Sequence, residues 1–143
     1  MSEITCLGCR LANKEIEANI IYENDRIICI LDIVPLNEGH MLILPKKHFH
    51  DVDDLDEATA TEVMRTSSFL TKLLKSHFQP QGITILQNNG TFNDLTHYHM
   101  HVFPRYEFDG FGWLEPIDSK NAKGRLKETA ATLVALLNQQ LLS

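Results

Sequence analysis

Three histidines at alternate positions are the residues of this chain best suited to chemistry. His97, His99 and His101 lie in the stretch "LTHYHMHVFPRY", with one other residue between each pair. Imidazole has an unperturbed pKa of about 6.5, so near neutral pH it can serve as a nucleophile, a proton donor or acceptor, or a metal ligand. The spacing therefore raises the question of whether the three side chains share one task or divide several.

Strand geometry answers part of this question. Residues 96–103 are predicted to form a strand that Pro104 closes, and alternate side chains of a strand point to the same face. The histidines would share one face, while Tyr98, Met100 and Val102 would face the core. The outer two histidines would lie roughly 13 Å apart, whereas a zinc–nitrogen bond is about 2 Å long. One metal ion cannot bind all three, so we expect them to have different roles rather than to form a merely polar strand face.

Cys6 and Cys9 form a Cys-x-x-Cys motif, which is spaced for a single metal ion. A zinc site would need two more ligands. His97 could supply one, and either His48 or His50 in "LPKKHFH" could supply the other. Such a closed site of two cysteines and two histidines would be structural. The alternative interpretation is a pair of unrelated small residues near the N-terminus.

The remaining sequence predicts a single α+β domain over residues 1–143. A long helix is expected over about residues 54–78, with Asp54 and Glu57 as a capping box. A C-terminal helix is expected over residues 123–142, with an apolar stripe at helical spacing. We expect helices packed on one face of an antiparallel sheet. Apolar runs bounded by turn residues predict its strands at about residues 19–22, 26–32, 40–45, 83–88 and 96–103.

Composition narrows the class of protein. The chain has 143 residues, 43% of them hydrophobic, and a net charge of −6, which suits one compact domain. No long basic run indicates nucleic-acid binding. No stretch has the length of a membrane span, and the start lacks the apolar region of a signal peptide, so we expect a cytoplasmic protein without a membrane partner. An odd count of three cysteines argues against a disulfide framework, and Cys29 is expected to be inert core.

These motifs together resemble the histidine triad (HIT) family of nucleotide-binding hydrolases and transferases. "HYHMHVF" matches its His-x-His-x-His signature, and the resemblance extends through "CLGC", "ILDIVPLNEGHMLILPKKH", "QNNG" and "PRYEFDGFGW" over nearly the whole chain. The chain looks most like the zinc-containing bacterial branch, which is similar to nucleoside phosphoramidate and dinucleoside polyphosphate hydrolases. The resemblance implies a five-stranded antiparallel sheet with two main helices and a two-fold homodimer.

The resemblance also implies roles for individual residues. His99 would be the nucleophile that attacks the α-phosphorus, forming a nucleotidyl-histidine that water then releases. His101 would stabilise the charge that develops on the phosphate, and His40 matches the family's additional active-site histidine. No catalytic metal would be required. The ligands of a structural zinc would be Cys6, Cys9, His48 and His97.

The ligand implied is a purine nucleotide such as AMP or a derivative. Asp32 matches the acidic residue that accepts the ribose hydroxyls, and Asn88 matches an asparagine near the phosphate and ribose. The loop before the triad departs from the family's Gly-Gln-Ser/Thr pattern and is about two residues shorter. Asn93 would replace the glutamine and Asp94 the hydroxyl residue. Because a carboxylate repels a phosphate unless it is protonated, paired or turned away, Asp94 could instead suit a basic leaving group such as an amine.

Three classes of function stay open at this point. The leading expectation is an enzyme, a nucleotidyl hydrolase or transferase that works through His99. The altered loop at Asn93 and Asp94 favours a nucleotide-binding regulatory module with little turnover. The third class is a metal-binding protein that uses the histidines collectively. Trp113, in "DGFGW", is expected either to pack in the core or to reach the site of a partner subunit.

Overall fold

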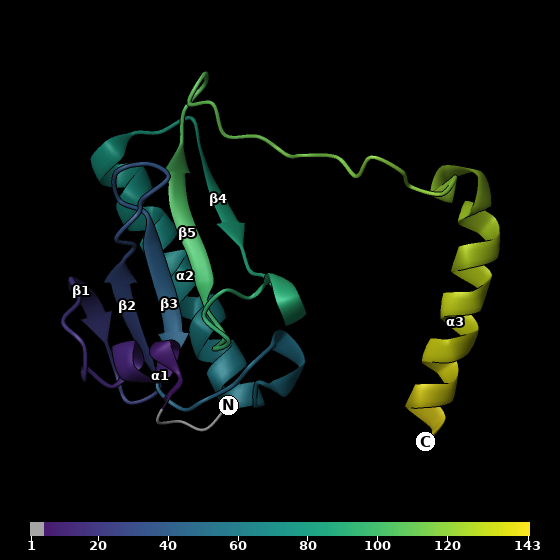
Figure 1. Cartoon of the computed structure of the whole chain (residues 1–143), viewed down its shortest axis with the longest axis horizontal. Helices are drawn as coiled ribbons and strands as arrows, with labels where there is room; N and C mark the ends of the chain where they lie inside the picture. The colour runs from purple at the N-terminus through teal and green to yellow at the C-terminus, as the bar shows by residue number, and fades with distance from the viewer. Residues whose placement is uncertain (1–4) are drawn as a thin grey trace. The chain divides into compact units, whose positions relative to one another are not determined.

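A computed structural model describes residues 5–143 of the chain. Its contacts divide the chain into two units, Met1–Phe111 and Gly112–Ser143. The first unit contains a five-stranded antiparallel sheet with the order β1-β2-β3-β5-β4 (Figure 1). The five predicted strands are therefore confirmed, although their ends differ from the prediction. They are β1 (Ile20–Glu23), β2 (Ile27–Leu31), β3 (Met41–Pro45), β4 (Gly82–Leu86) and β5 (Met100–Arg105).

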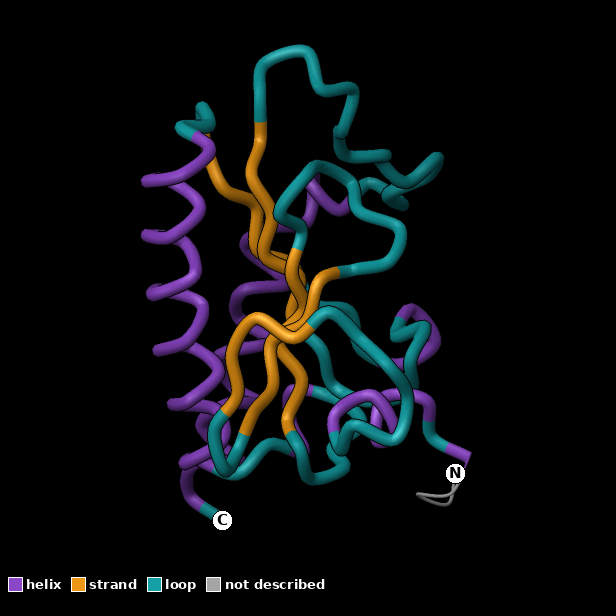
Figure 2. Tube along the Cα trace, turned by 90° about the vertical axis from the view of Figure 1, so that its left-hand side faces the viewer, coloured by secondary structure: helices purple, strands orange, loops and turns teal. Residues whose placement is uncertain are grey.

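The central strands are buried on both faces, as the unbroken apolar run of β3 predicts. Side chains alternate between two apolar clusters: Met41 and Ile43 belong to one, and Leu42 and Leu44 to the other. The neighbouring β2 alternates in the same way. Figure 2 shows the strands from the side, where the twist of the sheet is visible. This doubly covered sheet is the rigid element that carries the site residues.

The long helix α2 (Glu57–Phe78) covers the first cluster and contacts β2, β3, β4 and β5. Its N-cap is Asp56, whose carboxylate accepts a hydrogen bond from the Thr59 backbone N–H at 2.7 Å. The prediction of Asp54 as the cap is wrong. Asp54 instead ends the short 3-10 turn η2 (Val52–Asp54) and accepts from the Asp51 backbone N–H. Four aspartates lie within residues 51–56, and local preference alone could not choose among them.

A short helix that the sequence did not predict, α1 (Leu7–Ala12), lies on the opposite face of the sheet from α2 (Figure 1). Ala12 belongs to the second apolar cluster, and Leu11 packs against it. The expectation of helices on one face only is therefore wrong. A helix of six residues is too short to show a helical period in the sequence.

The strand β5 begins at Met100, later than predicted, so His97 and His99 lie in the segment that precedes it. Tyr98 donates its backbone N–H to Phe49 in the loop after β3, at 2.7 Å, instead of joining the sheet ladder. The predicted alternation is nevertheless confirmed. The side chains expected to face the core are buried in the first cluster, and the rings of His99 and His101 lie 4.9 Å apart.

Pro104 does not end β5 but pairs with Ile83 inside the strand. The pairing of β5 with β3 stops at Val102. Beyond that point the Pro104 carbonyl accepts a hydrogen bond from Asn37 Nδ2 at 2.8 Å. The N–H that proline lacks would point to the same open side, so its absence interrupts no ladder hydrogen bond.

The second unit contains the 3-10 turn η4 (Ala122–Arg125) and the helix α3 (Leu126–Leu142). The predicted C-terminal helix is thus confirmed, with its first turn wound more tightly. Its apolar stripe is exposed, with Leu133 60% and Leu137 55% accessible. Trp113 is 86% exposed, which does not support burial in the core. Among the described residues, no helix combines the length and apolarity needed to cross a membrane.

Candidate functional site

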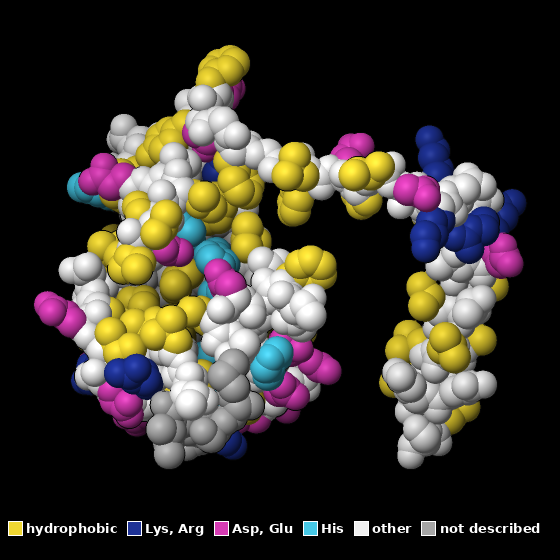
Figure 3. All heavy atoms as spheres, in the orientation of Figure 1, with side chains coloured by type: hydrophobic (Ala, Val, Ile, Leu, Met, Phe, Trp, Pro, Cys, Tyr) yellow, Lys and Arg dark blue, Asp and Glu magenta, His cyan; other side chains and the backbone are white. Residues whose placement is uncertain are grey.

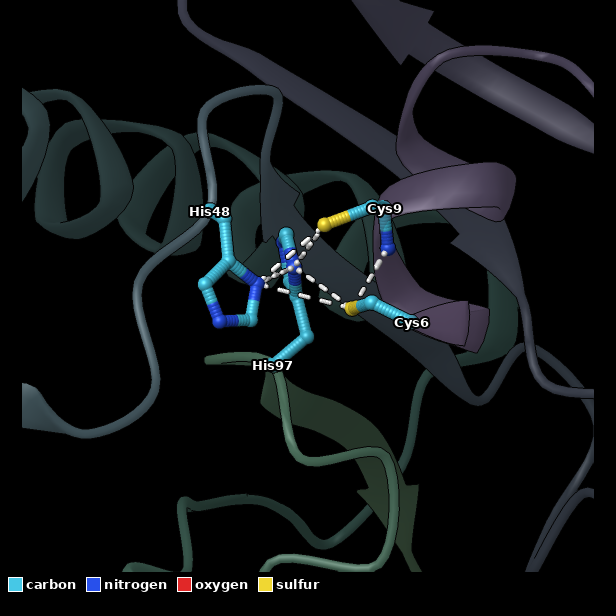
Figure 4. A group of neighbouring side chains, drawn as sticks. All are labelled: Cys6, Cys9, His48 and His97. Carbon is cyan, nitrogen blue, oxygen red and sulfur yellow. Dashed lines mark hydrogen bonds between the residues drawn. The ribbon is translucent and has the colours of Figure 1, made fainter. Parts of the chain in front are cut away.

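Four predicted metal ligands converge where α1 meets the loop after β3 and the segment before β5 (Figure 4). The His48 Nδ1 atom lies 3.5 Å from the sulfur of Cys6 and 3.1 Å from that of Cys9. The His97 Nδ1 atom lies 3.6 and 3.4 Å from the same sulfurs, and 3.3 Å from the His48 Nδ1 atom. Ligands of a tetrahedral zinc ion, with bonds of about 2.0 to 2.3 Å, lie roughly 3.3 to 3.8 Å from one another. The four side chains therefore fit one zinc ion.

The surroundings of the cluster favour metal binding by His97. Its Nε2 faces the Pro45 carbonyl at 2.8 Å, and because a carbonyl can only accept, the proton is on Nε2 and the Nδ1 lone pair faces the sulfurs. Burial lowers the pKa of His97 to about 4, which keeps the ring neutral. Of the two candidate histidines in "LPKKHFH", the structure brings His48 into the cluster. His50 instead pairs with Asp51 at 2.8 Å.

One ring nitrogen of His99 contacts the backbone, and the other faces the side chain of Asp94. Its Nδ1 lies 2.9 Å from the His97 carbonyl oxygen and donates to it. The lone pair of the neutral ring is therefore on Nε2, the nitrogen that would attack an electrophile. The residue is 2% exposed yet lines a cavity, so the nitrogen is held in place and can still meet a ligand.

His40 and His101 form a chain of hydrogen bonds whose direction is fixed by the backbone. The Leu36 N–H donates to His40 Nδ1 at 3.1 Å, so the proton of neutral His40 is on Nε2. That proton is donated to His101 Nδ1 at 2.9 Å, which leaves a donor N–H on His101 Nε2. Burial lowers the pKa of both rings, that of His101 to about 4, so both are neutral at pH 7.

Asp32 follows β2 and lies beside this histidine pair. One carboxylate oxygen accepts from the Val34 backbone N–H at 2.9 Å, which holds the side chain in a turn. The other oxygen lies 3.6 Å from His40 Nε2 and 4.0 Å from His101 Nδ1. The three groups are close enough to suggest a second metal site. However, the proton on His40 Nε2 occupies the position that a metal would need, so these groups are better explained as a hydrogen-bonded network.

The loop before the triad places its two predicted residues differently. Asp94 reaches His99, with its Oδ1 3.2 Å from His99 Nε2. Asn93 is 3% exposed, and its side chain donates to the His50 carbonyl and accepts from the Leu95 backbone N–H. Asn93 therefore fixes the loop and does not line the cavity. Asn88 is exposed after β4 and also lies outside the cavity lining.

A cavity of about 330 Å³ connects these groups. The ionisable residues of its lining are Glu17, Asp32, Asp94, His99 and His101. Figure 3 shows histidine side chains in this hollow, bordered by hydrophobic ones. An apolar wall beside a few polar groups is typical of a small-molecule site. The apolar residues come from α1, the sheet and the loop before the triad, and include Leu7, Leu11, Ile30, Leu31, Leu42 and Leu95.

Sequence reasoning missed the contributions of the backbone and of α1. The Leu36 N–H and the carbonyls of Pro45 and His97 fix the tautomers, yet such groups have no signature in residue type. Leu7 and Leu11 form part of the cavity wall. Their spacing of four residues beside a Cys-x-x-Cys pair was the one available signal.

Comparisons with known proteins agree with this arrangement. A family model described as the HIT domain matches residues 13–108. An uncharacterized HIT-like protein of Methanocaldococcus jannaschii is 35% identical over 120 residues, which cover 79% of this chain and 92% of that protein. An adenosine 5'-monophosphoramidase of Candida albicans is 28% identical over 136 residues, which cover 89% of this chain and 90% of that protein.

Solved structures give the same result. A HIT family protein from Bacillus subtilis matches with a TM-score of 0.78 and 28% identity, over 92% of this chain and 95% of that one. A zinc-bound histidine triad family protein from Mycobacterium smegmatis matches with a TM-score of 0.71 and 26% identity, over 94% and 99%. The family model matches more than half of the sequence, and a relative exceeds 30% identity across most of it. The chain therefore belongs to the HIT, or histidine triad, family.

Proposed function

We propose that this protein is a nucleotidyl hydrolase or transferase. It would cleave a nucleoside phosphoramidate or a dinucleoside polyphosphate at the α-phosphorus. The observation that carries the proposal is the orientation of His99, whose Nδ1 is held by a carbonyl while Nε2 faces a cavity. An adenosine 5'-monophosphoramidase among the relatives supports a purine nucleotide such as AMP as the ligand.

The reaction would proceed in two displacements. The Nε2 lone pair of His99 attacks the α-phosphorus, and the bond from phosphorus to the leaving group breaks with its electron pair going to the leaving atom. The Nδ1–H donated to the His97 carbonyl stabilises the positive charge that the ring acquires. Water then attacks the nucleotidyl-histidine, which releases the nucleoside monophosphate and restores the ring.

His101 would stabilise the transferring phosphoryl group through its Nε2–H. His40 would act indirectly, as a positioning residue. The proton that it donates holds His101 in the tautomer with the Nε2–H donor. The direction of the chain is set by the Leu36 N–H. In this scheme neutral rings act as hydrogen-bond donors, in agreement with the lowered pKa of both histidines.

The nucleoside would occupy the apolar part of the cavity. The free carboxylate oxygen of Asp32 would accept hydrogen bonds from the ribose hydroxyls. The base would lie against the apolar wall that includes Leu7, Leu11 and Leu42. Asn88 stays a predicted contact to the phosphate and ribose, whereas Asn93 is better explained as the residue that supports the loop.

Cys6, Cys9, His48 and His97 would bind a structural zinc ion. The distances among their donor atoms support this, as does the zinc-bound relative. Zinc would join α1 to the segment that carries the triad. With all four positions taken by side chains, such a site leaves no position open for substrate.

Two other classes compete with the enzyme. A regulatory module with little turnover is favoured by the exposed carboxylate of Asp94 beside His99, which could hinder a phosphate. A protein that uses the triad collectively for metal is disfavoured, because His97 belongs to the cysteine cluster while His99 and His101 face the cavity. Turnover therefore decides between the first two classes.

The test is hydrolysis of a fluorogenic adenosine phosphoramidate by the wild-type protein and by His99→Ala. We expect the variant to lose at least about 10³-fold in kcat, since the nucleophile is gone. The matched control is His77→Ala, an exposed histidine on α2, which should retain wild-type activity. Equal rates in the wild type and His99→Ala, or AMP binding without any turnover, would contradict the proposal.

A further inference from the structure

Asp94 lies directly in front of the proposed nucleophile. Its Oδ1 is 3.2 Å from Nε2 of His99, the nitrogen that would form the bond to phosphorus. The His99 side chain is only 3% exposed, whereas that of Asp94 is 83% exposed. The carboxylate therefore borders both the reactive nitrogen and the solvent side of the cavity.

The backbone that carries Asp94 is held firmly in this position. The buried side chain of Asn93 donates to the His50 carbonyl at 2.7 Å and accepts from the Leu95 backbone N–H at 3.2 Å. The residues on both sides of Asp94 are thus anchored, even though its own side chain is exposed. Its closeness to the nucleophile follows from the fold of the loop.

The charged side chains that line the cavity are acidic. Three carboxylates line it, those of Glu17, Asp32 and Asp94, and none of the described residues in its lining is a lysine or an arginine. A phosphate site would ordinarily offer positive groups. The carboxylates of this cavity instead repel additional negative charge on a ligand beyond the single phosphate that His99 and His101 can contact.

We propose that Asp94 determines specificity by the charge of the leaving group, favouring nucleoside phosphoramidates whose departing amine carries a positive charge. The inference rests on the proposed function of His99. A carboxylate 3.2 Å from Nε2 stands where the phosphorus must approach, so the exposed Asp94 side chain has to turn toward solvent when a substrate binds. In-line attack sends the leaving group away from Nε2 and toward solvent, the side to which that carboxylate then turns. The P–N electron pair stays on the amine nitrogen, which takes a proton from solvent, while the bond from His99 Nε2 to phosphorus forms.

Three adenosine phosphoramidates that differ only at the far end of the amine test the inference. Their amines are 1,2-diaminoethane, 2-methoxyethylamine and β-alanine, which give a cationic, a neutral and an anionic leaving group. At a separation of about 4 Å near water, a unit charge changes the interaction by about 1 kcal/mol, or roughly fivefold in rate. We expect kcat/KM to fall about fivefold at each step from cationic to neutral to anionic.

Asp94→Asn keeps the shape and removes the charge, and we expect it to bring the three kcat/KM values to within about twofold of one another. Glu17→Gln is the matched control, since it removes one charge from the lining of the same cavity and leaves Asp94 in place. It should retain the wild-type order. A measurement on the unaltered protein accompanies the variants: raising the ionic strength to about 1 M, where the screening length is about 3 Å, should weaken the discrimination.

The outcomes separate this inference from the proposed function. If the folded wild-type protein hydrolyses none of the three substrates, the proposed function itself is overturned. Hydrolysis of all three substrates at equal rates would leave that function standing and overturn the role of Asp94. That role would also be overturned if Asp94→Asn kept the wild-type order, or if Glu17→Gln abolished that order equally.

Discussion

At the scale of single residues, the site depends on which nitrogen of each histidine has the proton. His97 donates from Nε2 to Pro45, which frees Nδ1 for the cysteine cluster, whereas His99 donates from Nδ1 and frees Nε2 for the cavity. Two neighbouring histidines thus present opposite nitrogens because they meet different carbonyls. The sequence predicts that the histidines have different roles, but not which ring nitrogen each one presents. That choice depends on the carbonyls of Pro45 and His97, which residue types do not reveal.

The lowered pKa of His101 leads to a prediction about how the stability of the protein depends on pH. Its pKa is lowered from 6.5 to about 4 by burial, so between these values the unfolded chain binds the proton more readily than the folded one. Stability is therefore lost as pH falls from about 6.5 toward about 4. We expect His101→Gln, which keeps an acceptor for His40, to remove up to about 3 kcal/mol of this dependence. Denaturant unfolding of both proteins at about pH 7 and about pH 4.5 measures it; parallel losses in the two proteins would contradict it.

The second prediction concerns Gly8, which lies inside the Cys-x-x-Cys motif. A Cβ added there would overlap the Cβ of His97, so Gly8→Ala must displace either α1 or His97, one of the proposed zinc ligands. We expect loss of bound zinc and about 2 kcal/mol or more of stability, as for an overpacked core. Gly112→Ala is the control, because nothing lies within 4 Å of its Cβ position. Metal analysis and thermal unfolding measure both effects, and full zinc content in Gly8→Ala would refute the prediction.

At the scale of helices and strands, the spacing of apolar residues along the chain explains which elements could be predicted from the sequence. The unbroken apolar run of β3 predicts burial on both faces, and all five of its residues are buried. Residues buried on α2 recur at helical spacing, as in Val63, Ser67, Leu70 and Leu74. The start of β5 could not be predicted in this way, because the Tyr98 backbone N–H bonds to a loop rather than to a strand. The helix α1 was missed, since its stability depends on the cysteine cluster and the sheet rather than on its own six residues.

The helix α1 links the cysteine cluster to the cavity. Cys6 caps it and Cys9 lies within it, while Leu7 and Leu11 line the cavity wall. We expect Cys9→Ser to lose zinc and to weaken AMP binding about tenfold, because an unanchored α1 no longer holds this wall. Metal analysis and calorimetric titration with AMP provide the readouts. The control is Cys29→Ser, a buried cysteine outside the cluster, which should keep its zinc; undiminished AMP affinity in a zinc-free Cys9→Ser would contradict the link.

At the scale of the whole molecule, the apolar stripe of α3 bears on assembly. The family resemblance predicts a homodimer, and exposed leucines along a helix are typical of a surface that another chain covers. We expect light scattering to give twice the mass of one chain. The double variant Leu133→Glu, Leu137→Glu should shift the protein toward the monomer, whereas Asn138→Glu on the same helix should not. A monomeric wild-type protein would rule out this prediction.

Catalysis through His99 requires that this residue become covalently attached to a nucleotide. Rapid acid-free quenching of the wild-type protein during turnover of an adenosine phosphoramidate, followed by peptide mass spectrometry, detects such an adduct directly. We predict an adenylate on the peptide that contains His99, and none in His99→Ala. Turnover at an undiminished rate with no adduct at any time, or an adduct on another residue that persists in His99→Ala, would show that His99 is not the nucleophile.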